Sequence, residues 1–154
     1  MSEQTMADAL LTLWKAKAPA STYVLAANST ARGDLSVFGE NRYGVAIMPG
    51  PFTNADGAFS RQHDRVWTFD VYVGARYDDQ PEVILDVMTV SQALIDTTDE
   101  WPRLNATAGV LNARVISGDT PVLGALISDP DGPTYVVRTI RVQVEENVSI
   151  TESE

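Results

Sequence analysis

The clearest pattern in the chain is an alternation of apolar and polar residues between Val66 and Arg76. Odd positions carry Trp67, Phe69, Val71, Val73 and Ala75, and even positions carry Thr68, Asp70, Tyr72 and Arg76. A period of two residues is typical of a β-strand with one buried face. The segment therefore predicts a strand whose apolar face packs in the core and whose polar face meets water or a partner.

Two other segments repeat their apolar residues every three or four positions, which predicts amphipathic helices. The first runs from about Glu3 to Lys17, and its apolar face comprises Met6, Ala7, Leu10, Leu11, Leu13 and Trp14. The second begins near Pro81, directly after Asp78 and Asp79. We interpret these two carboxylates as helix-start residues, because acidic groups stabilise the positive end of a helix. The expected buried stripe of the second helix is Ile84, Val87, Met88, Ser91, Leu94 and Ile95.

Further strands are expected at residues 23–27, 43–48, 110–117, 122–128 and 134–146. The links GDTP and DPDGP between the last three strands are rich in turn-forming residues, so we expect these strands to form an antiparallel meander. The stretch PGPFTNADGAFSRQHD, residues 49–64, carries prolines and glycines without a clear period. It predicts a long loop, which in a compact domain is usually functional or mobile.

This order of elements predicts the α+β class, because helices and strands do not alternate regularly. We expect an antiparallel or mixed sheet with the N-terminal and central helices packed on it and the strand meander at the C-terminal end. Residues 1–146 form a single domain in this interpretation, which suits a chain of 154 residues. The acidic residues 147–154 are expected to fray.

Composition narrows the functional classes. The chain has no cysteine, which excludes disulfides, thiolate metal sites and a cysteine nucleophile. Its 11 basic and 21 acidic residues give a formal net charge of -10, which disfavours non-specific binding to nucleic acid. No apolar run is long enough to cross a bilayer. The N-terminus has no basic start before its apolar residues, so we expect no secretory signal and folding in a cytoplasm.

The sequence contains few candidate catalytic residues. His63 is the only histidine, and a metal site would need further ligands beside it and Asp64. A serine triad would need a serine next to this histidine, and nothing around Ser60 resembles a nucleophile elbow. No glycine spacing matches a nucleotide-binding loop. We therefore expect that the chain is not an enzyme and binds no metal or cofactor. We expect it to act through contacts made by its surface.

Five residues are the candidate interface positions. Arg32, Arg42, Arg61 and Arg65 lie in or next to the two long irregular segments. If those segments meet, the arginines could dock an acidic neighbour, including another copy of this chain; otherwise they are scattered solvated charges. Trp101 follows the second helix and is either an anchor for a partner or a cover for the helix end.

The stretch RVWTFDVYVGARYDDQPEVILDVMTVSQALID, residues 65–96, resembles the centre of tail terminator proteins of long-tailed phages and related tailed viruses. In that family a long amphipathic strand ends in an Arg-Tyr-Asp type turn, and a helix then begins at an acidic residue. The N-terminal helix, the upstream stretch YGVAIMPGPF and the terminal strands are also similar. The likeness covers about residues 5–146 and is one of pattern and order, without a diagnostic short motif.

The resemblance implies a structural virion protein that forms a ring, typically hexameric, at the head-proximal end of the tail tube. Such a ring binds the tube protein, ends tube polymerisation and joins the neck, connector or head-completion protein. DNA would pass through its lumen without specific binding, which fits the acidic charge. The chain would be assembled in the host cytoplasm and would not bind a membrane.

Three alternatives stay open at this point. The chain could be a neighbouring neck or head-completion protein of the same assembly. It could be a non-catalytic module that binds a ligand or a partner, which a preformed apolar pocket would favour. It could also be a carboxylate hydrolase, with candidates among Asp70, Asp78 and Asp79.

Overall fold

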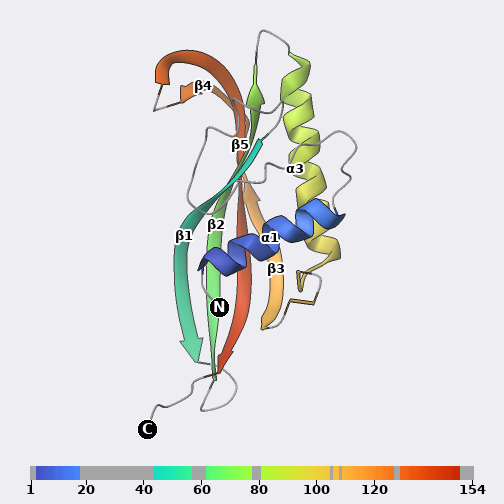
Figure 1. Ribbon diagram of the computed structural model, residues 1–154, viewed down its shortest axis with the longest axis vertical. Coiled ribbons are helices and arrows are strands. Elements are labelled where there is room, and N and C mark those ends of the chain that lie inside the picture. Colours follow the sequence, from blue (N-terminus) through green and yellow to red (C-terminus); the bar gives the residue numbers. More distant parts are fainter. Residues whose placement is uncertain are drawn as a thin grey trace.

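The computed structural model describes residues 3–17, 44–56, 62–77, 81–104, 106–107, 109–126 and 129–149. Within them the elements in chain order are α1 (Glu3–Lys17), β1 (Gly44–Asp56), β2 (Gln62–Arg76), α3 (Glu82–Glu100), β3 (Val110–Gly118), β4 (Val122–Leu126) and β5 (Asp129–Ser149). Both helices lie over one face of a long twisted sheet; α1 crosses the strands, and α3 runs roughly along them (Figure 1). The predicted α+β class is confirmed.

The sheet is built around β5, its longest strand. The described strands pair in the order β1-β2-β5-β3, and β4 also pairs with β5; every one of these pairings is antiparallel. β2 pairs with one side of β5 over the whole range from Gln62 to Arg76. Among the described strands, β1 therefore forms one edge of the sheet, and β3 with β4 forms the other.

The predicted meander is confirmed for β4 and β5, which pair antiparallel, but it is wrong for β3 and β4, which do not pair with each other because both lie along the same side of β5. Gly118 at the end of β3 pairs with Ile140, and Val122 at the start of β4 pairs with Val137. Three residues, 119–121, thus face two residues of β5, 138–139. The GDTP segment is a bulge-like interruption in one edge strand, because β5 is long enough to pair with both halves.

The loop expected at residues 49–64 is wrong for residues 49–56 and 62–64, because β1 continues to Asp56 and β2 begins at Gln62; residues 57–61 lie outside the described residues. The prolines are accommodated on an edge strand, where an N–H is not needed on the open side. A bulge lies between Pro49 and Phe52, and Gly50 makes it possible. A Cβ at Gly50 would collide with the Thr68 carbonyl oxygen.

The core lies between the sheet and the helices, as the periodicities predict. The expected apolar face of α1 is buried throughout, and so are the odd positions of β2 from Trp67 to Ala75. β5 contributes Val136, Ile140, Val142 and Val144 from its inner face. Trp14 and Thr98 join the helices: the Trp14 Nε1–H donates a hydrogen bond to the Thr98 Oγ1 over 3.0 Å, and both residues are fully buried.

The buried stripe of α3 differs in part from the expected one. Ile84, Met88 and Ile95 are only partly buried. The buried positions are Val83, Val87, Val90, Ser91, Leu94, Thr97 and Thr98. The two threonines can enter the core because their hydroxyls donate to the carbonyls of Ala93 and Leu94 in the preceding turn. Part of the buried face of α3 is therefore formed by polar residues, which a search for apolar periodicity does not find.

The start of α3 and the end of β5 also differ from expectation. Pro81 is the N-cap of α3 and makes no side-chain capping bond; Asp78 and Asp79 lie outside the described residues. β5 continues to Ser149, so residues 147–149 belong to the sheet rather than to a frayed tail. The expected strand at 23–27 lies outside the described residues. No helix in the described part of the chain is long and apolar enough to cross a membrane.

Candidate interaction edges of the sheet

The structure describes two of the five predicted interface residues. Arg32, Arg42 and Arg61 lie outside the described residues. Arg65 is part of β2, and Trp101 is the C-cap of α3. The predicted grouping of the four arginines therefore lies largely outside the described residues, and Arg65 itself belongs to strand β2.

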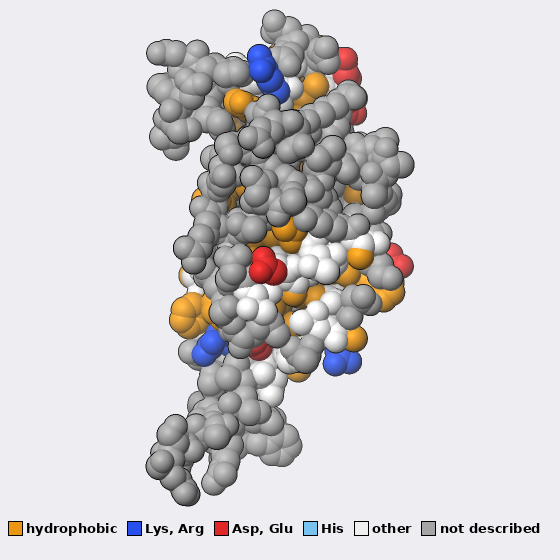
Figure 2. Space-filling view, viewed as in Figure 1, with side chains coloured by type: hydrophobic (Ala, Val, Ile, Leu, Met, Phe, Trp, Pro, Cys, Tyr) orange, Lys and Arg blue, Asp and Glu red, His pale blue; other side chains and the backbone are white. Residues whose placement is uncertain are grey.

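Exposed large apolar side chains instead mark the two edges of the sheet. Six such side chains are exposed among the described residues: Phe52, Leu85, Leu111, Ile116, Val122 and Leu123. Only Leu85 is on a helix; the other five belong to the edge strands β1, β3 and β4. Figure 2 shows hydrophobic side chains on both flanks of the lower half of the molecule. Apolar groups gathered at such edges are typical of protein–protein contact sites.

At the β1 edge, Phe52, Arg65 and Trp67 form a compact group, which we term the β1 edge cluster. The Phe52 and Trp67 ring centroids are 5.1 Å apart with an interplanar angle of 39°. The Arg65 guanidinium carbon lies 5.5 Å from the Phe52 centroid and 5.4 Å from the Trp67 centroid. These distances suit cation–π contacts with both rings. Phe52 is 50% exposed, whereas Trp67 is buried beneath it.

A buried hydrogen bond fixes the floor of this cluster. The Trp67 Nε1–H donates to the Glu146 Oε1 over 3.2 Å, and Glu146 is 3% exposed. A buried indole needs such an acceptor, and the bond holds its ring in one orientation. Phe52 therefore rests on a rigid aromatic surface. Aromatic residues and arginine are the side chains that most often dominate binding interfaces.

At the opposite edge, two bulges expose Leu111 and Ile116, which we term the β3 edge cluster. Val110 pairs with Glu146 and Asn112 with Glu145, so Leu111 is the extra residue of the first bulge. Ile116 is the extra residue of the second, between Val115 and Ser117. Bulges re-aim side chains and are common at sheet edges. Here each one turns a large apolar side chain toward solvent.

A third irregularity, between β3 and β4, is fastened by Arg138. The Arg138 Nε–H donates to the Asp119 carbonyl oxygen over 3.1 Å, and its Nη1 donates to the Ser91 Oγ over 2.8 Å. The Asp119 N–H in turn donates to the Thr139 carbonyl oxygen over 2.8 Å. A Cβ at Gly118 would lie 3.1 Å from the Arg138 Nη2, so glycine leaves room for the guanidinium. Arg138 thereby connects the edge strand to α3.

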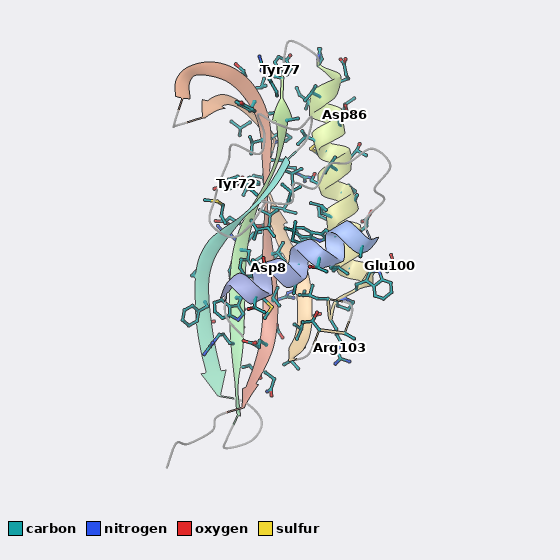
Figure 3. The ribbon with its side chains drawn as sticks, viewed as in Figure 1. Asp8, Tyr72, Tyr77, Asp86, Glu100 and Arg103 are labelled. Carbon is teal, nitrogen blue, oxygen red and sulfur yellow. The ribbon has the colours of Figure 1, made fainter. Side chains whose placement is uncertain are left out.

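The flank beside β3 also carries the end of α3. Trp101 is half-buried and packs against the core, and its N–H donates to the Thr97 carbonyl oxygen over 3.0 Å. Trp101 therefore covers the end of the helix, which is the second of the two roles considered for it from the sequence. Glu100 and Arg103 lie on the same flank, on the side of β3 (Figure 3). The last turn of α3 carries no basic residue, and Asp99 and Glu100 are exposed there.

The outer face of the sheet is polar, as predicted. An ion pair joins Asp70 of β2 to its cross-strand neighbour Arg141 of β5, with 2.9 Å between the Asp70 Oδ1 and the Arg141 Nε. The hydrogen bond that Arg141 donates to Asp70, and secondarily the negative charge of Asp70, raise the pKa of the Arg141 guanidinium above its ordinary value. Ser117, Asp119 and Thr139 complete a polar depression of about 80 Å³ around this pair.

The described residues contain no group of three or more histidine, aspartate or glutamate side chains placed to hold a metal ion. His63 belongs to the backbone ladder of β2, so it lies in a strand rather than in the expected loop. Compared with known proteins, the chain matches no family model and no curated protein sequence.

Proposed function

We propose that this chain is a structural virion protein that forms a hexameric ring on the head-proximal end of a viral tail tube. The ring would cap the tube protein, end its polymerisation and join the tail to the neck or head. In this proposal the chain catalyses nothing and uses no cofactor. Its role would be to cover the free end of the tube, where further tube subunits would otherwise bind.

The observation that carries the proposal is the presence of exposed apolar side chains on both edges of one sheet. A ring of identical subunits needs two different surfaces on each subunit, so that one copy's first surface meets the next copy's second. In this proposal the β1 edge cluster and the β3 edge cluster, which lie on opposite sides of the described sheet, supply the two surfaces. The resemblance of residues 65–96 to tail terminators adds the tail tube as the place of assembly.

Charge supports the same proposal. The formal net charge of -10 gives the assembly a surface that repels DNA phosphates. A ring through which a genome travels benefits from that repulsion, because attraction would slow the passage of DNA.

A module for small ligands has less support in the described residues. Pockets for such ligands are mostly apolar and measure roughly 300–1,000 Å³. The depression around Asp70 and Arg141 is polar and measures about 80 Å³. Asp70 is paired with Arg141 there, which leaves it poorly suited to the role of a hydrolase carboxylate.

Native mass spectrometry and negative-stain imaging of the purified chain test the proposal, together with localisation of the chain in tailed particles. We expect closed rings in solution or on isolated tubes, and one ring at the head-proximal end of the tail. A chain that forms no ring in either setting and is missing from tailed particles would contradict the proposal.

A further inference from the structure

We propose that the β1 edge cluster of one copy docks on the β3 edge cluster of the next copy. This inference rests on the proposed function and names the contact that would close the ring. The occupant of each edge is therefore a second copy of this chain, in a head-to-tail arrangement.

The first argument is position. Phe52 pairs with Trp67, Trp67 pairs with Val144, and Val144 pairs with Ala113. The two edge clusters thus lie at opposite ends of one row that crosses the whole sheet, because Leu111 and Ile116 flank Ala113 along β3. Neighbouring copies placed side by side at the same level would bring the clusters together.

The second argument is strand direction. Each step across the sheet from β1 to β3 is antiparallel, so β1 and β3 run in opposite directions. A neighbouring copy in the same orientation therefore presents its β1 antiparallel to β3, and the alternation of the sheet continues across the contact. The two-fold alternative, in which β3 pairs with the β3 of another copy, would leave Phe52 exposed and would end at a dimer.

The third argument is that the contact is suited to side chains rather than to a continuous backbone ladder. Pro49 and Pro51 remove two N–H groups from β1, and a bulge separates Pro49 from Phe52. β3 carries two bulges of its own. Such features discourage uncontrolled strand pairing at sheet edges. Each edge nevertheless exposes a large apolar side chain next to a bulge, which favours specific packing over open-ended growth.

The fourth argument is charge. The β1 edge cluster carries Arg65, whose guanidinium covers the Phe52 and Trp67 rings. The opposite flank carries the exposed carboxylate of Glu100 beside β3 (Figure 3), and the exposed carboxylate of Asp99 precedes it in the last turn of α3. These carboxylates lie at the negative end of a helix, where a cation from outside is favourable. In the head-to-tail arrangement, Arg65 of one copy approaches this acidic end of the next.

Two variants of the full chain test the contact. Phe52→Asp disables the β1 edge, and Leu111→Asp combined with Ile116→Asp disables the β3 edge. We expect each variant alone to lose self-association by at least tenfold in sedimentation experiments over rising concentration. An equimolar mixture has one intact pair of edges and should give a heterodimer that grows no further. Leu85→Asp, on α3 and 69% exposed, is the matched control and should assemble like the wild type.

Circular dichroism melting of each variant separates assembly from folding, since the four side chains are between 44% and 69% exposed. As a further check, Arg65→Glu should weaken assembly, and Glu100→Arg in the same chain should restore part of it. Such rescue would not follow from a role of Arg65 in folding alone.

Several results would overturn the contact. Rings unaffected by both edge variants would refute it while leaving the ring proposal intact. A Phe52→Asp chain that still dimerises, beside a monomeric β3 variant, would indicate the two-fold alternative instead. A wild-type chain that forms no assembly in solution or on isolated tubes would also refute it. Localisation of the chain in tailed particles would then decide whether the proposed function stands.

Discussion

Arg138→Met tests whether the interrupted edge strand is held in place by one side chain. Methionine keeps an unbranched side chain between Val136 and Ile140 on the inner face of β5 but removes the guanidinium. The variant loses the hydrogen bonds to the Asp119 carbonyl and to the Ser91 hydroxyl. Ser91 keeps a partner, because its hydroxyl donates to the Met88 carbonyl oxygen over 3.0 Å.

The expected loss follows from these two bonds. A hydrogen bond to a charged group contributes about 1.5–3 kcal/mol when buried. Arg138 is half-buried, so we expect a loss for both bonds together of about 1–3 kcal/mol in the free energy of unfolding. For a chain of this size, each kcal/mol lowers Tm by roughly 2–4 °C.

Urea denaturation followed by circular dichroism measures the loss, and a double-mutant cycle assigns it. Ser91→Ala removes one partner, and the combined variant should lose less than the sum of the two single losses. Amide hydrogen exchange gives a local readout: the Asp119 amide, bonded to the Thr139 carbonyl, should exchange faster in Arg138→Met. A loss in the free energy of unfolding below about 0.5 kcal/mol, together with unchanged exchange at the Asp119 amide, would show that Arg138 does not hold the edge strand in place.

Two further substitutions test the core and the β1 bulge. Thr98→Val should lower the free energy of unfolding by about 1–3 kcal/mol, because it leaves the buried Trp14 indole N–H without its acceptor. Thr98→Ser keeps a hydroxyl and should lower it less. Equal losses for the two variants in urea denaturation would count against a stabilising role of this hydrogen bond. Gly50→Ala should cost about 1–3 kcal/mol through its clash with the neighbouring backbone. Gly124→Ala is its control, because nothing lies within 4 Å of a Cβ there; a Gly50→Ala chain as stable as this control would contradict the bulge geometry.

The candidate edges could be foreseen only in part from the sequence. Arg65 was identified by charge, yet its partner Phe52 was assigned to a loop because of the surrounding prolines and glycines. The β3 edge carried a readable signal: Val110–Leu111 and Val115–Ile116 place two large apolar residues side by side, which breaks the alternation of a strand. Each such pair marks a bulge, in which the extra residue faces solvent.

Amphipathic periodicity in the sequence determined α1, β2, most of α3 and the α+β class. The periodicity reflects which face of an element is buried, so it is recognisable without knowledge of what that face packs against. Even there, Thr97 and Thr98 were missed, since their burial depends on hydroxyl bonds to the preceding helical turn.

Only the tertiary structure decided how the strands are arranged and where the edges lie. Local turn residues favoured a hairpin at GDTP, but the 21-residue β5 pairs with both β3 and β4 along one side. Residues 49–56 of the proline-rich stretch became part of β1 because β2 supplies partners for their backbone on both sides of the bulge between Pro49 and Phe52. Strand neighbours depend on contacts between distant segments, which no local pattern encodes. The exposure of Phe52, Leu111 and Ile116, and with it the candidate interface, follows from that arrangement.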